Sequence, residues 1–420
     1  MCLLEKDKFM KRPSTQKIIV ISLLASLILP FMGYGEHCTN GTTTYGTNDI
    51  GVKYNPITLS TGICYVVDED VTMAKYSTVL FDTDGDDIHF ANNGELLSYV
   101  SGDIDGIVLS VLHDDFELTN GSDGLIHTYA NKAVSFDSNG NSYDMILINS
   151  GTIKADGKYA VYSKDVLDLT NNSNAEISAN KNTIYTEANT EIENNADATI
   201  TSTEGDTIHV KSGTLTLTNS GTLSSGENNT IYIGDTSANQ STITNNENGL
   251  ISSASSYTIF SQSENLNVDN SGTIKGINSI YINGTNTTIE NKTSGIIEGE
   301  IQSLKSGTTI QNSGTIDGVL EEGILLSGGN ATITNDQGAT IRSESNAIKS
   351  SGSGFILNNS GVIETSTNNA TISWSGTGTI NNLAGGVIKS IGAAIESSES
   401  DHKIKNSGSI ESEGSYAIKS

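Results

Sequence analysis

The chain contains the stretch Asn149-Ser150-Gly151-Thr152-Ile153, and closely related stretches return about every 23 residues until Asn406-Ser407-Gly408-Ser409-Ile410. A fixed period of this length is typical of proteins built from stacked structural repeats. One copy is too short to bury its own apolar residues, so neighbouring copies must stack to form a shared core. The repeat therefore predicts a solenoid whose chemistry is spread along a surface rather than gathered around a pocket.

Each copy carries three apolar positions inside short runs in which polar and apolar residues alternate. The second position, after the Gly or its substitute, runs from Ile153 to Ile410, and the third, about eight residues later, from Val161 to Ile418. The first position precedes the Asn and comprises Leu147, Leu169, Ile192, Leu217, Ile243, Val268, Ile289, Ile310, Ile333, Ile356, Ile380 and Ile404. Alternation of this kind predicts three strands per copy, each with one or two inward side chains. We therefore predict an all-β fold, a right-handed parallel β-helix solenoid of pectin-lyase-like architecture, with three short strands and about 23 residues per rung.

The turn between the first two strands occurs in two forms. From Asn219 onward, short turns of the form Asn-Ser-Gly alternate with turns one or two residues longer, such as Asn245-Asn246-Glu247-Asn248-Gly249. This alternation indicates duplication of a two-rung unit. Asn and Gly are expected here because they tolerate positive φ. Stacked Asn side chains are also expected to hydrogen-bond from rung to rung.

The composition fits this fold and excludes one class of partner. The formal net charge is −27 at pH 7, and the only arginines are Arg12 and Arg342. A nucleic-acid partner requires a basic surface, so none is expected. Only three prolines occur, the last at Pro56, as expected of a chain whose backbone N–H groups are used in sheet ladders.

Three segments are predicted. Residues 1–35 are expected to be a secretory signal, because the basic residues Lys11, Arg12 and Lys17 precede the apolar run Ile18 to Leu29 and small residues lie near Gly35. The start of translation at Met1 or Met10 stays open, and the alternatives for this segment are a buried helix or a membrane anchor. Residues 36–145 are predicted as an N-terminal cap with irregular first rungs, and residues 146–420 as a regular β-helix of about twelve rungs.

Two cysteines follow the predicted signal, Cys38 and Cys64. In an oxidising compartment they are expected to form one disulfide that holds the N-terminal segment, and the alternative is two free thiols.

One column beside the third apolar column is aromatic. Because its members are adjacent to inward residues, they should point outward and stack on six consecutive rungs. The column consists of Tyr162, Tyr185, His209, Tyr232, Phe260 and Tyr281, after which it becomes polar. Two interpretations stay open: a ladder that stabilises an exposed sheet face, or a contact surface for sugar rings or another protein.

Motifs for catalysis are mostly missing from the sequence. It contains no Gly-x-Ser-x-Gly, no phosphate-binding loop and no His-Glu-x-x-His, and its six histidines lack metal-ligand spacing. The acidic pairs Asp86-Asp87 and Asp114-Asp115 are the only candidates for hydrolysis. The carboxylates of Asp82, Asp84, Asp86 and Asp87 are a candidate calcium site, although the spacing lacks a complete calcium loop. No other cofactor and no catalytic residues are predicted.

The repeats in 146–420, together with the signal-like segment 1–35, resemble the passenger region of bacterial autotransporters with right-handed β-helical stems. The resemblance implies export by a Gram-negative bacterium to its cell surface, outer membrane or surroundings, with the help of a C-terminal outer-membrane β-barrel. The chain departs from that pattern at Ser420, inside a rung and without barrel strands, so we expect a fragment or a truncated gene.

The resemblance implies a non-catalytic adhesin stem that attaches to a host or abiotic surface through a glycan or protein ligand. Two alternatives stay open. The first is a β-helical enzyme acting on polysaccharides, and the second is a structural protein that self-associates to aggregate cells.

Overall fold

The computed structural model describes residues 57–420 except 68–71, 76–78, 85, 100–105, 114, 139–143, 237–239 and 399–401, and it leaves out the side chains of Lys75 and Asp84. The described residues form strands and connecting turns and contain no helix. Consequently, no helix in this part of the chain is long and apolar enough to cross a membrane. The predicted signal at 1–35 lies outside the described residues.

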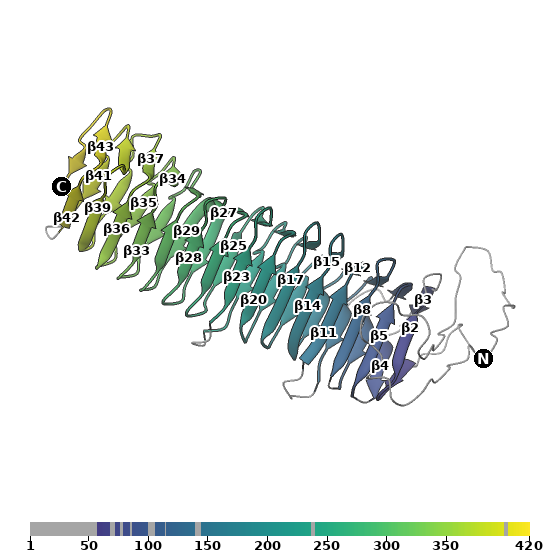
Figure 1. Ribbon diagram of the computed structural model, residues 1–420. Coiled ribbons are helices and arrows are strands. Elements are labelled where there is room, and N and C mark those ends of the chain that lie inside the picture. Colours follow the sequence, from purple (N-terminus) through teal and green to yellow (C-terminus); the bar gives the residue numbers. More distant parts are fainter. Residues whose placement is uncertain are drawn as a thin grey trace, which may run out of the picture.

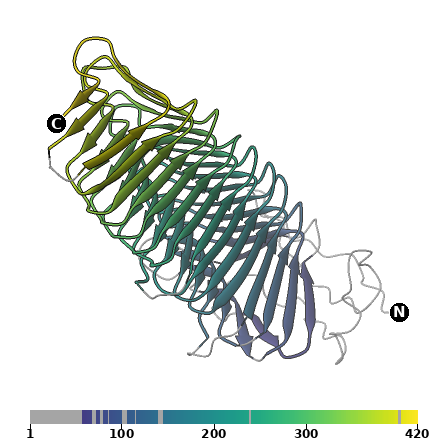
Figure 2. The ribbon, with the colours of Figure 1, turned by 60° about the vertical axis from the view of Figure 1, so that its left-hand side comes forward.

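The strands wind into a parallel β-helix of about 14 turns with about 24 residues per turn, as predicted, and the winding is consistent with a right-handed solenoid. Its rungs follow one another along a single axis to form a rod (Figure 1). Figure 2 shows the same stack after a turn about the vertical axis. Every strand pairs in parallel with the equivalent strand of the neighbouring rung, so the rod has three sheet faces.

We call the face that ends in asparagine the asparagine face. Its 15 strands are β2 (Cys64–Val67), β5 (Ile88–Asn92), β8 (Phe116–Asn120), β11 (Asp144–Asn149), β14 (Val166–Asn171), β17 (Thr190–Asn194), β20 (Leu215–Asn219), β23 (Thr242–Asn245), β26 (Asn267–Asn270), β28 (Thr288–Asn291), β30 (Thr309–Asn312), β33 (Thr332–Asn335), β36 (Phe355–Asn359), β39 (Gly378–Asn382) and β42 (His402–Asn406).

The second face follows the asparagine turn. Its strands are β3 (Thr72–Lys75), β6 (Glu95–Ser98), β9 (Leu125–Thr128), β12 (Thr152–Ala155), β15 (Glu176–Ala179), β18 (Thr199–Ser202), β21 (Thr222–Ser225), β24 (Leu250–Ser253), the first parts of β27 (Thr273–Ile282) and β29 (Ile296–Ser303), β31 (Thr315–Asp317), β34 (Thr340–Ser343), β37 (Val362–Thr365), β40 (Val387–Ser390) and β43 (Ser409–Ser412).

The third face completes the rung. Its strands are β1 (Ile57–Ser60), β4 (Val79–Asp84), β7 (Ile107–Val111), β10 (Lys132–Phe136), β13 (Tyr159–Ser163), β16 (Ile184–Thr186), β19 (Ile208–Val210), β22 (Ile231–Ile233), β25 (Tyr257–Ser261), the last parts of β27 and β29, β32 (Ile324–Leu326), β35 (Ile348–Ser350), β38 (Ile372–Trp374), β41 (Ile395–Ser397) and β44 (Ile418–Lys419).

The predicted apolar columns form the core, with one correction. In the first column, Ile356 was predicted to point inward, and this was wrong: Leu357 pairs with Ile333 and is fully buried, whereas Ile356 is 41% exposed. The reason is the double asparagine after it, because Asn359 rather than Asn358 aligns with Asn335. In the last rung, Ile404 and Ile410 are partly buried and Ile418 is 46% exposed.

A continuous ladder of buried asparagines runs along the inside of the first corner. In each rung an Asn Nδ2 group donates to the Asn Oδ1 of the next rung at 2.8–2.9 Å, from Asn92 through to Asn406. Asn245, for example, also donates to the carbonyl oxygens of Gly249 and Thr273. The predicted rung-to-rung bonds are therefore confirmed, and each buried amide is satisfied by a neighbour.

The reason for glycine in the short turns differs from the one expected. The described short-turn glycines and ladder asparagines do not have positive φ, which instead occurs in the long turns at Asn174, Asp197 and Asn248. A Cβ atom on Gly221 would lie 2.3 Å from the carbonyl oxygen of Ala198 in the preceding rung. Glycine is required there because successive rungs approach each other closely, not because of backbone handedness.

The second corner, between the second and third faces, contains a repeated hydroxyl. Thr183, Thr207, Thr230, Thr258, Ser279 and Thr371 each donate from the side chain to a carbonyl oxygen of the following rung. Strand β29 breaks this pattern with Glu300, which is 7% exposed and adjoins the register shifts between β27 and β29. Burial, reinforced by the nearby Glu322 and Glu321 and opposed by Lys349, raises the pKa of Glu300 to about 7.

Candidate functional site

The predicted aromatic column stacks along the third face. Tyr162, Tyr185, His209, Tyr232, Phe260 and Tyr281 occupy equivalent positions of six successive strands, β13 to β27. Neighbouring ring centroids are 4.5–5.5 Å apart and neighbouring ring planes are inclined by only 5–17°. We call these six residues the aromatic ladder. The predicted stacking is confirmed.

The rings of the aromatic ladder present their edges, rather than their faces, to solvent. Because the rings are nearly parallel and one rung apart, each inner ring covers the faces of its neighbours. At the first ring, the Lys132 amino group lies 3.6 Å from the Tyr162 ring centroid, a cation–π contact that covers the outer face. Tyr162 is only 8% exposed. Sugar rings that pack on aromatic faces would find few of them free, which favours the stabilising interpretation of the ladder.

Polar groups tie the ladder to the rungs around it. The His209 ring lies between Tyr185 and Tyr232, and its Nδ1 is 2.7 Å from Asp206 Oδ2. Asp206 is buried and its other oxygen accepts from Asn229. Burial, assisted by Glu187, raises the pKa of the Tyr162 and Tyr185 hydroxyls. Tyr162 and Tyr185 therefore stay neutral over the physiological pH range.

Two further rings belong to this surface and were missed by the sequence analysis. Tyr159 is tilted against Tyr162 and Tyr185, and Tyr257 is tilted against Phe260 and Tyr281, with centroid distances of 4.8–5.7 Å. Each precedes a ladder ring by three residues, as in Tyr159-Ala160-Val161-Tyr162. That spacing gave no signal, because alternation along a regular strand places residues three apart on opposite faces.

The predicted calcium carboxylates lie at the turn between β4 and β5, where the side chain of Asp84 is outside the described residues. Asp86 Oδ1 lies 3.8 Å from His113 Nδ1, and Asp87 Oδ1 lies 3.5 Å from His89 Nε2. Across the described residues, no group of three or more His, Cys, Asp or Glu side chains is arranged to hold a metal ion. Without the Asp84 side chain, the calcium site stays a prediction.

The same turn brings histidine and acid together on neighbouring rungs. His89 Nδ1 on β5 lies 3.1 Å from Glu117 Oε2 on β8. The hydrogen bond to Glu117, together with the charges of Glu117 and Asp87, outweighs burial and raises the pKa of His89. Asp114, the first residue of the second acidic pair, lies outside the described residues.

Only one of the two cysteines of the predicted disulfide lies within the described residues. Cys64, the first residue of β2, is disulfide-bonded. Cys38, its predicted partner, lies outside the described residues, so the pairing itself stays a prediction.

A hollow of about 400 Å³ lies at the second corner beside Tyr129, and the sequence analysis did not single it out. Tyr129 follows β9 and is 43% exposed, and Tyr99, which follows β6, stacks on it at 5.0 Å with the planes inclined by 16°. Asp156, Gly157, Lys158 and Asn180 of the next two rungs also line this hollow. We call it the Tyr129 hollow.

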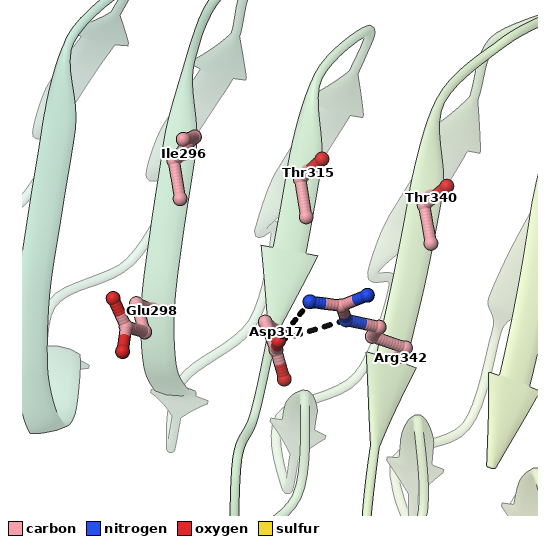
Figure 3. Close-up of a pocket in the computed structure, with 6 residues that line it drawn as sticks. All are labelled: Ile296, Glu298, Thr315, Asp317, Thr340 and Arg342. Atoms are coloured by element: carbon pink, nitrogen blue, oxygen red, sulfur yellow. Dashed lines mark hydrogen bonds and ion pairs between the residues drawn. The ribbon is translucent and has the colours of Figure 1, made fainter. Parts of the chain in front are cut away.

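A second hollow, of about 380 Å³, lies on the outer surface of the second face and is shown in Figure 3. Asp317 Oδ2 on β31 accepts hydrogen bonds from Arg342 on β34, at 2.8 Å from Nε and 2.7 Å from Nη2. Glu298 on β29 points away from this pair in the figure and instead lies 2.9 Å from Lys275. Each charged group in this hollow is thus paired with an opposite charge, which suits a structural role.

Comparisons with protein-family models, with curated proteins and with solved structures found no match to this chain.

Proposed function

We propose that this chain is a non-catalytic β-helical stem, displayed on the surface of an exporting cell, that attaches the cell to a glycan- or protein-coated surface. The observation that carries the proposal is the uniform rod. The same three strands repeat in register along the described chain, and the asparagine ladder continues through all rungs from β5 to β42. Such a rod extends surface groups away from its anchor without gathering them into one pocket.

The polar outer surface agrees with this role. Most cationic side chains are paired with a carboxylate on a neighbouring rung, as in Lys181–Glu204, Lys389–Glu364 and Lys419–Glu396. Exposed pairs of this kind contribute little stability individually. They leave a strongly acidic, soluble surface that resists unwanted association of rods.

The proposal is tested by displaying the full chain on a non-adherent cell and counting cells retained on glycan- and protein-coated plates. We expect retention above that of the same cells without the chain. A matched control is Ile259→Asp, which places a charge in the fully buried core and should destroy the rod and the retention together. Equal retention with and without the displayed chain would contradict the proposal, and clumping of cells without any coating would favour the self-association alternative.

One observation favours the enzyme alternative enough to test it. His89, Asp87 and Glu117 place an imidazole between two carboxylates on neighbouring rungs. Most glycoside hydrolases use a pair of carboxyl groups on either side of the scissile bond. Release of reducing ends from a panel of polysaccharides, lost in Asp87→Asn and retained in Asp123→Asn, would support hydrolysis. No release from any polysaccharide would leave the attachment proposal.

A further inference from the structure

We infer that the Tyr129 hollow is a binding site for a saccharide ring that carries a carboxylate or sulfate group. This inference rests on the proposed attachment function and names the ligand class for it. The hollow lies at the second corner, where the rungs of β9, β12, β15 and β18 contribute its lining.

The aromatic part of the site is the ring of Tyr129. Tyr99, in the preceding rung, covers one of its faces, and the hollow lies on the side of the following rung. For this reason Tyr129 is 43% exposed, whereas Tyr162, the first ring of the aromatic ladder, is only 8% exposed. A half-open tyrosine next to polar groups suits a saccharide, whose rings combine an apolar C–H surface with a rim of hydroxyls.

Gly157 marks a close approach of two rungs beside this ring. A Cβ atom there would lie 1.0 Å from the carbonyl oxygen of Ala130, so no side chain fits at this corner. The rung that follows Tyr129 therefore passes close to the one before it. The tyrosine ring and the polar groups of the next rungs face the same space.

A buried histidine lies beside the Tyr129 ring and contacts Asp156. His127, two residues before Tyr129, is 7% exposed, and its ring centroid lies 4.1 Å from that of Tyr129. Its Nε2 lies 3.1 Å from Asp156 Oδ2 but is not aligned for a hydrogen bond, so this buried atom has no hydrogen-bond partner. Burial lowers the pKa of His127, so the ring is neutral at pH 7. Asp156 lines the hollow and can accept a hydrogen bond from a sugar hydroxyl, whereas the buried His127 ring is not part of the lining.

The charges around the hollow specify an acidic ligand. Lys154 is paired with Asp156 and Lys181 with Glu204. Lys158 is exposed and, within the described part of the chain, makes no ion pair with a carboxylate. On a chain with net charge −27, an unpaired ammonium group beside a partly exposed aromatic ring is the feature that would select an anionic sugar over a neutral one.

The test is equilibrium binding of the full chain to an oligosaccharide of uronic acid units and to its carboxyl-reduced, neutral counterpart. We expect saturable binding of the acidic form at least about tenfold tighter than of the neutral form. Tyr129→Ala should weaken the binding of both about tenfold or more, and Lys158→Gln should remove the preference for the acidic form. Tyr257→Ala changes a half-buried tyrosine beside the aromatic ladder, far along the rod, and should leave both affinities unchanged.

Absence of saturable binding to either oligosaccharide would overturn the inference, and so would binding that Tyr129→Ala leaves intact. Circular dichroism of each variant verifies the fold, and Tyr129→Phe, which keeps the ring, should bind like the unaltered chain. Cells that display Tyr129→Ala and are retained as well as those with the unaltered chain would refute this site while leaving the attachment function standing. If cells that display the unaltered chain are not retained, the attachment function itself is refuted.

Discussion

Two regions of the rod share a core but differ on the outer surface of the third face. From β13 to β27 the outward position carries the aromatic ladder. From β29 onward the same position carries Gln302, Leu325, Lys349, Ser373, Glu396 and Lys419. Inside, both regions have the same buried aliphatic columns and the same asparagine ladder.

This difference teaches that the fold depends on the inward pattern and tolerates several solutions outside. One region joins its rungs by aromatic stacking, and the other joins them by ion pairs such as Lys349–Glu322 at 2.9 Å. Stacked aromatic pairs contribute roughly 0.5–1.5 kcal/mol each beyond the area that they bury. Exposed ion pairs contribute roughly 0.2–1 kcal/mol. We therefore expect the aromatic region to be the locally more stable part of the rod.

The largest effect should come from the element that the two regions share. Asn194→Ala in the aromatic region and Asn335→Ala in the other each remove a buried amide that bonds to the rungs on both sides. Because buried groups are left without partners, each should lower the local free energy of opening by about 3 kcal/mol. Hydrogen exchange of the flanking strands measures this, and a large effect in only one region would contradict a common core.

The junction between the regions should respond to pH through Glu300. Its pKa of about 7 in the folded chain exceeds the ordinary 4.5, so the folded state binds the proton more tightly than the unfolded state. This contribution to stability is fully present below pH 4.5 and is lost as the pH rises through 7. At about 1.36 kcal/mol per pKa unit, the change is on the order of 3 kcal/mol.

Hydrogen exchange of β29 and β32 at pH 5 and pH 8, corrected for intrinsic rates, should show this loss, and Glu300→Gln should abolish it. Glu298→Gln is the control, because that carboxylate lies on the outer surface beside Lys275. An unchanged pH trend in Glu300→Gln would show that another group is responsible.

A smaller effect should follow from breaking the aromatic ladder. Tyr232→Ser removes the stacking on both His209 and Phe260, which should cost about 2 kcal/mol of local stability in β19 to β25. Tyr232→Phe keeps the ring and should cost less than about 0.5 kcal/mol, since Phe260 already occupies an equivalent position. Similar losses in both variants would mean that the hydroxyl, not the stack, is important.

The smallest effect is expected in the other region. At pH 5, where Glu300 is protonated, Lys349→Ser removes only one exposed ion pair and should cost less than about 0.5 kcal/mol. High salt should reduce this cost further. Urea unfolding, monitored by hydrogen exchange in β35, measures this loss of stability. A loss as large as that of Tyr232→Ser would eliminate the proposed difference between the regions.

Much of this architecture was predictable from the sequence, because the period and the inward residues are set by local alternation. This alternation correctly predicted the two apolar columns after the turn. It also predicted the hydrogen bonds between asparagines and the stacking of the aromatic column. Ile356 was misassigned because only the alignment of Asn359 with Asn335 fixes the register there. The burial of Glu300 was not predicted. It depends on the register shifts at the second corner, where β27 and β29 each continue from the second face to the third without interruption.

The candidate sites were less predictable for a physical reason. The order of rings along the ladder can be read from the sequence, but the inclination of their planes cannot, and that inclination decides whether edges or faces meet the solvent. The Tyr129 hollow depends on residues of four rungs that are up to 75 positions apart, from Tyr129 to Glu204. No local pattern joins them. Only the winding of the chain brings them together.

The most direct test of the central claim, one core with two outer surfaces, is hydrogen exchange of the unaltered full chain resolved by strand. We predict slower exchange in β16 to β25 than in β35 to β41, with the difference reduced in Tyr232→Ser. Equal exchange in the two sets of strands, or faster exchange in β16 to β25, would contradict it.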